Sequence, residues 1–73
     1  MSNQNDRQKR ITKIFNSVIE CGESGCDKEK IVALMGIEMG IARRTTLEYI
    51  KMLIYAERII LKEGMLYANS DPV

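Results

Sequence analysis

Residues 40–53 carry charged side chains at helical spacing. At 100° per residue, Arg44, Glu48 and Lys51 fall on one face of a helix. Arginine can donate two hydrogen bonds to guanine O6 and N7, and both cations can bind phosphate. A carboxylate on the same face can accept a hydrogen bond from cytosine N4. Arg44, Glu48 and Lys51 therefore predict a helix face that can bind nucleic acid. The alternative is that these charges form an ordinary solvated surface.

The same helix has a second, mostly apolar face, and a glycine turn precedes it. The second face consists of Thr46, Tyr49, Ile50, Leu53 and Glu57. Gly40 can adopt the positive φ of a sharp turn, and Ile41 can fill the corner with an apolar side chain. A tight turn followed by a two-faced helix, here expected at about residues 42–58, is typical of the second helix of a helix-turn-helix.

The run Gly-Ile-Ala-Arg-Arg-Thr-Thr-Leu-Glu-Tyr-Ile-Lys-Met-Leu resembles the recognition helix of small winged-helix regulators. Their pattern is Gly-Ile-Ser, two variable residues, Thr-Val, two variable residues, then Tyr-Leu. The likeness continues through Glu-Arg-Ile-Ile (57–60) and Gly-Met-Leu-Tyr (64–67), at the place of the wing, and covers residues 6–68. It is strongest to small archaeal and archaeal-virus winged-helix DNA-binding proteins. Ala42 departs from the pattern by replacing the serine cap, and Thr46 departs by standing where valine is common.

The resemblance implies three helices, a short two-stranded wing and sequence-specific binding of double-stranded DNA by a homodimeric transcription regulator. It places Arg44, Thr45, Glu48 and Lys51 near base edges. The cations expected at phosphates are Arg43, Lys28, Lys30 and Lys62. Arg43 is alternatively an ion-pair partner, and Lys62 would reach the minor groove from the wing tip. For Glu48 we expect a pair with Arg44 or Lys51 along the helix rather than a base contact.

Composition narrows the function classes. The chain has 73 residues, a net charge of +1 and no histidine, so it lacks an imidazole base or metal ligand. No nucleophile–base pair or phosphate loop is evident, so we expect no enzyme activity, no cofactor, no metal and no small-molecule ligand. Without an apolar run of about 18–20 residues or a secretory signal, we expect no membrane association and a cytoplasmic location, in the host cytoplasm if the protein is viral.

The remaining elements follow from periodicity. We expect a flexible N-terminus over residues 1–5 and then one domain over residues 6–68. Its first helix would be capped by Asp6, ended by Gly22 and buried along a stripe centred on Phe15. The members of that stripe are Ile11, Ile14, Phe15, Val18 and Ile19.

The second helix would be capped by Asp27 and would bury Ile31, Leu34, Met35 and Met39. It either runs through Gly36 to residue 39 or stops at that glycine. Two short strands at residues 59–61 and 65–68 would flank a three-residue loop closed by a bulge. Residues 69–73 are expected to form a flexible tail.

Two further features allow alternatives. For Cys21 and Cys26 we expect free thiols; a disulfide, within the loop or between subunits, and an all-cysteine zinc site shared by two chains are the alternatives. Met52 and Tyr55 lie away from the apolar face of the third helix. They indicate a protein-interaction (adaptor) module as the rival function, unless the N-terminal helix covers them.

Overall fold

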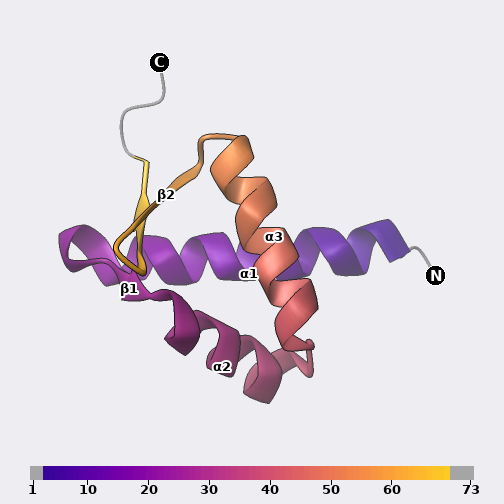
Figure 1. Ribbon diagram of the computed structural model, residues 1–73. Helices are drawn as coiled ribbons and strands as arrows, with labels where there is room; N and C mark the ends of the chain where they lie inside the picture. The colour runs from indigo at the N-terminus through magenta and orange to yellow at the C-terminus, as the bar shows by residue number, and fades with distance from the viewer. Residues whose placement is uncertain (1–2, 70–73) are drawn as a thin grey trace.

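Helices dominate the described chain. The computed structural model describes residues 3–69 (Figure 1). The elements in order are α1 (Asn3–Cys21), the 3-10 helix η1 (Gly22–Ser24), β1 (Cys26–Asp27), α2 (Lys28–Met39), α3 (Arg43–Tyr55), β2 (Ile59–Lys62) and β3 (Met65–Ala68). In Figure 1, α3 crosses α1, and the N-terminal part of α1 extends past this crossing. Among the helices of residues 3–69, none combines the length and apolar composition needed to cross a membrane.

The strands form one small antiparallel sheet in the order β1-β3-β2. We predicted only β2 and β3. The strand that we did not predict is β1, which pairs with β3 through Cys26 and Leu66. Its two residues are too few to show the alternating pattern of a strand. The loop prediction was also wrong. Glu63 and Gly64 both have positive φ, 52° and 80°, between the paired residues Lys62 and Met65. This is the geometry of a two-residue type I′ hairpin rather than a bulged three-residue loop.

The first helix is longer than predicted. It begins at Asn3, so Asp6 lies within its first turn and is not its N-cap. Three of the five residues assigned to a flexible N-terminus therefore belong to α1; residues 1–2 and 70–73 lie outside the described residues. The helix ends at Cys21, directly before Gly22, which confirms the predicted end; Gly22 has the left-handed φ of 66°. At the other end of the chain, the Asn69 N–H donates to the Arg58 carbonyl at 2.9 Å, so residue 69 continues the folded part.

The second helix is continuous through Gly36 to Met39. The Asp27 carboxylate accepts a hydrogen bond from the Glu29 N–H at 2.9 Å, which confirms the predicted cap. Gly40 ends the helix with φ 65° and ψ 28°, a left-handed conformation that glycine adopts without strain. The alternative in which α2 stops at Gly36 is therefore excluded.

One apolar core joins all three helices to the sheet. Its buried members are Ile14, Val18, Cys26, Ile31, Met35, Ile41, Tyr49, Ile50, Leu53, Ile59 and Leu66. Phe15 packs at the margin of this core and is not its centre, and Ile19 and Leu34 are exposed. The buried stripe of α1 is narrower than predicted, because Ile14 and Val18 occupy the face that the rest of the domain covers.

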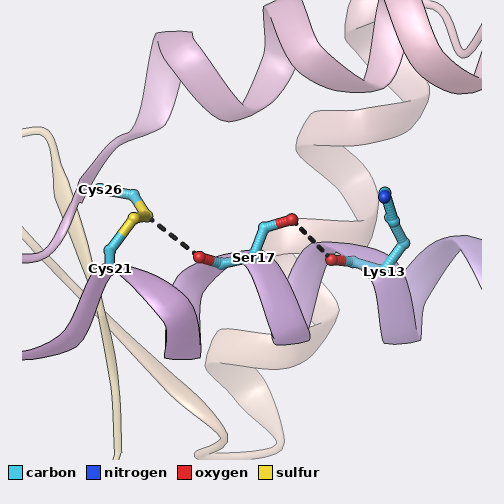
Figure 2. Close-up of a disulfide and its surroundings, with 4 residues drawn as sticks. All are labelled: Lys13, Ser17, Cys21 and Cys26. Carbon is cyan, nitrogen blue, oxygen red and sulfur yellow. Dashed lines mark hydrogen bonds between the residues drawn. A yellow bond between two sulfur atoms is a disulfide. The ribbon is translucent and has the colours of Figure 1, made fainter.

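A disulfide joins Cys21, at the end of α1, to Cys26 in β1 (Figure 2). The two Cα atoms are 5.7 Å apart. The expectation of free thiols is thus not met, because the turn at residues 22–25 brings the two sulfurs together. Cys26 Sγ also lies 3.4 Å from the Ser17 carbonyl oxygen. A disulfide sulfur has no proton to donate, so this contact becomes an S–H···O hydrogen bond only in the reduced protein.

Candidate nucleic-acid interface

The two faces of α3 are oriented as predicted. Thr46, Tyr49, Ile50 and Leu53 are buried. On the opposite side Arg44, Glu48 and Lys51 are exposed. We define these three residues, which follow one another at intervals of four and three, as the α3 ridge. A packed face behind the ridge fixes its direction, so the ridge projects as a unit rather than as three independent side chains.

The end of α3 differs from the prediction. The helix stops at Tyr55 rather than near Arg58. The Arg58 N–H donates to the Leu53 carbonyl at 2.9 Å, and the Glu57 N–H donates to the Ile54 carbonyl at 2.9 Å. These two bonds form a Schellman motif, with Glu57 in the left-handed position at φ 61°. Glu57 is exposed beyond the helix, so its predicted place on the buried face was wrong.

The surface beside the ridge is hollowed. Arg43, Arg44, Leu47, Glu48 and Lys51 line an open hollow of about 370 Å³. Sequence reasoning missed Leu47, which lies at the border between the buried and exposed faces of α3. Cations around an apolar floor can contact both the charged backbone and the apolar parts of a nucleic acid.

Arg43 does not project freely from the helix. Its guanidinium holds the Glu29 carboxylate through two parallel hydrogen bonds, Nη1 to Oε1 and Nη2 to Oε2, the second at 2.9 Å. Both side chains are 56% exposed. The hydrogen bonds from Arg43 lower the pKa of Glu29 below its ordinary value, and those to Glu29 raise the pKa of Arg43. The structure favours the ion-pair alternative for Arg43, and Glu29 could not be identified beforehand because the pairing depends on how α2 meets α3.

The predicted pairing of Glu48 along the helix is absent. Residues 3–69 contain two ion pairs, Arg43–Glu29 and Lys13–Glu38, and the second spans α1 and α2 with 2.9 Å between Nζ and Oε1. Neither involves Glu48. Its carboxylate is therefore available on the ridge beside the two cations. Ala42 makes no side-chain cap, as its residue type predicted.

The remaining predicted cations divide into two places. The Lys28 N–H donates to the Gly64 carbonyl at 3.0 Å, which ties the start of α2 to the hairpin turn that follows Lys62. Lys28 and Lys62 thus belong to neighbouring segments. Lys30 instead lines a groove of about 550 Å³ between α1 and α2, with Lys13 and Glu38. The structure therefore does not bring Lys30 together with the α3 ridge.

Four large apolar side chains on α2 and α3 are exposed to solvent, and Leu34, at 37%, is the least exposed of them. Ile37 is 83% exposed, Tyr55 81% and Met52 44%. The N-terminal helix does not cover the last two, so that alternative is wrong. Tyr55 follows Lys51 by four residues and extends the line of the ridge towards the end of α3. Thr45 is half-buried beside the ridge.

Comparison with known proteins identified no relative of this chain. The chain matches no protein-family model, and neither the curated proteins nor the solved structures include a match.

Proposed function

We propose that this chain is a winged-helix protein that binds double-stranded DNA in a sequence-specific manner as a small transcription regulator. Three helices followed by an antiparallel hairpin are compatible with that fold in its general form. The observation that carries the proposal is the α3 ridge: a 13-residue helix, anchored by its buried face behind a glycine turn, presents Arg44, Glu48 and Lys51 to solvent. A B-DNA major groove about 12 Å wide admits such a helix.

The dimensions of the ridge suggest how much sequence one domain reads. Arg44 and Lys51 are seven residues apart, which corresponds to ~10 Å along a helix. Base pairs repeat every ~3.4 Å, so the ridge spans about three base pairs. Three base pairs alone specify little in a genome. We therefore propose a homodimer that reads two half-sites about one DNA turn apart.

The residues have distinct proposed roles. Arg44 donates to guanine O6 and N7, and Thr45 and Lys51 lie near neighbouring base edges. Unpaired Glu48 accepts from cytosine N4. Lys28 and Lys62 hold phosphates on the flank of the groove, since the start of α2 and the hairpin turn are tied together. Lys30 has no part in this interface because it lines the α1–α2 groove.

The proposal is tested by selecting duplexes from a random pool with the purified protein and then comparing two arginine variants. Arg44→Ala removes the ridge arginine. Arg58→Ala removes the same charge beyond the far end of α3, where the backbone hydrogen bonds of Arg58 do not need its side chain. We expect Arg44→Ala to weaken binding of the selected duplex by ~1–3 kcal/mol and to relax the sequence specificity at one base position. Equal effects of the two variants would contradict placement of the ridge in the groove.

A second function is favoured by one specific observation, the exposure of Tyr55 and Met52 on α3. These side chains suit an adaptor module that binds a protein through the same helix. Salt distinguishes the two functions. DNA affinity falls steeply between about 50 and 200 mM salt, whereas an apolar protein contact does not. No enrichment of any duplex, together with salt-insensitive binding of a protein, would select the adaptor function.

A further inference from the structure

The Arg43–Glu29 pair links the first turns of the two helices that flank the Gly40 turn. Two features make it more than a chance surface contact. The guanidinium and carboxylate meet through two parallel hydrogen bonds, a geometry that is stronger and more directional than a single contact. Glu29 is itself placed by the N-cap of α2, because its N–H donates to the Asp27 carboxylate at 2.9 Å.

The start of α3 has no side-chain N-cap. Ala42 provides no side-chain cap, so the first N–H groups of the helix lack a side-chain acceptor there. The buried Ile41 side chain and its N–H, which donates to the Met35 carbonyl at 3.2 Å, hold the preceding turn. Arg43 is the first residue of α3. Its pair with Glu29 is therefore a polar tie between the first turns of α2 and α3, in addition to the buried side chains of Ile41 and Thr46.

The pair also determines which charges face outward. A carboxylate paired with the two terminal nitrogens of a guanidinium weakens the attraction of that guanidinium for a third, anionic group, because the two opposite charges act together at a distance. Within residues 3–69, Arg44 and Lys51 take part in neither ion pair. The cations left to act on an external anion at this surface are therefore those of the α3 ridge.

We infer that Glu29 is a positioning residue: it fixes the start of α3 through Arg43 and keeps Arg43 from binding phosphate, so that contact with DNA falls to the α3 ridge. The inference rests on the proposed function for its second half only. The first half, that the pair orders the start of α3, concerns the free protein and is measured without DNA.

The variants separate these effects. Glu29→Gln keeps the size of the side chain and removes its charge, Arg43→Gln removes the guanidinium, and a third protein carries both changes. Glu38→Gln is the matched control, because it removes one carboxylate of α2 from the other ion pair, with Lys13.

Amide hydrogen exchange of the free protein tests the positioning. The Thr46 N–H donates to the Ala42 carbonyl at 3.0 Å and reports whether the first turn of α3 is closed. We expect Glu29→Gln to speed exchange at Thr46 about two- to fivefold, the range for loss of a well-formed surface pair. Glu38→Gln should leave this rate unchanged. Equal rates in wild type and Glu29→Gln would overturn the positioning role.

The salt dependence of DNA binding tests the charge role. In Glu29→Gln the freed arginine gains a phosphate contact, so the slope of log K against log salt steepens by about 0.9, a three- to fourfold change between 50 and 200 mM. The ratio of specific to non-specific affinity falls. Arg43→Gln leaves the Glu29 carboxylate unpaired and facing DNA, so binding of every duplex becomes weaker by the same factor. The double variant has neither charge and returns to the wild-type slope.

The outcomes are distinguishable. If the double variant keeps a slope about 0.9 shallower than wild type, Arg43 itself binds phosphate and the inference is overturned. If the wild-type protein binds no duplex, the proposed function fails, and exchange at Thr46 alone decides whether Glu29 positions α3.

Discussion

Replacing Thr46, which lies on the buried face of α3, tests how tightly this helix packs on the core. Thr46 is 0% exposed, and its hydroxyl has no hydrogen-bond partner within the described residues. A buried hydroxyl without a partner costs ~1–3 kcal/mol relative to an apolar group of the same shape. Valine replaces that hydroxyl with a methyl group and keeps the β-branched shape. We therefore expect Thr46→Val to raise the free energy of unfolding by about 1–2 kcal/mol.

Urea unfolding followed by circular dichroism measures this change, with an unchanged m value showing that the unfolding reaction is the same. For a domain of this size, each kcal/mol corresponds to a rise in Tm of about 4–8 °C. Thr12→Val is the matched control, because Thr12 is exposed on α1 and its replacement should stay within about 0.5 kcal/mol. A neutral or destabilising Thr46→Val would show instead that the hydroxyl is hydrogen-bonded in solution.

Three other predictions follow from the same structure. Ala42→Ser should stabilise the protein by about 1 kcal/mol in urea unfolding, because Ala42 has the extended conformation of an N-cap (φ −64°, ψ 151°) and lacks only the acceptor; no gain would mean that these N–H groups are already satisfied. Reduction of the Cys21–Cys26 disulfide, which closes a loop of sequence separation 5, should lower the unfolding free energy by ~2 kcal/mol, and a variant with serine at both positions should not respond to dithiothreitol. Because its pKa is lowered on folding, Glu29 contributes stability above its ordinary pKa of 4.5, and this contribution is lost as pH falls through the folded value. The stability difference between wild type and Glu29→Gln should therefore shrink in acid, and a difference independent of pH would contradict the ion pair.

Local chemistry explains which parts of the fold could be predicted. Asp27 as a cap, Gly40 as a left-handed helix end and the buried face of α3 each depend on a few consecutive residues. Positive φ, capping and 100° periodicity act within that range, so the sequence carries the signal. The ridge of Arg44, Glu48 and Lys51 follows directly once the buried face is known.

The features that escaped prediction depend on contacts between distant segments. Strand β1 exists because Cys26 pairs with Leu66, 40 positions later, and two residues alone show no strand pattern. The Glu29–Arg43 pair depends on how α2 meets α3. The type I′ turn was missed for a different reason: Glu63 occupies a positive-φ position where asparagine or glycine is usual, so the turn signal was weak.

An NMR titration of the labelled protein with its selected duplex shows which amides lie at the DNA and therefore whether the α3 ridge contacts the bases. We expect the largest amide shifts at residues 44–51 and at the start of α2, and small shifts beyond the helix near Arg58. Shifts centred on Ile37, or on Met52 and Tyr55 without Arg44, would place the binding surface elsewhere on the domain and would overturn the proposed contact of the ridge with bases.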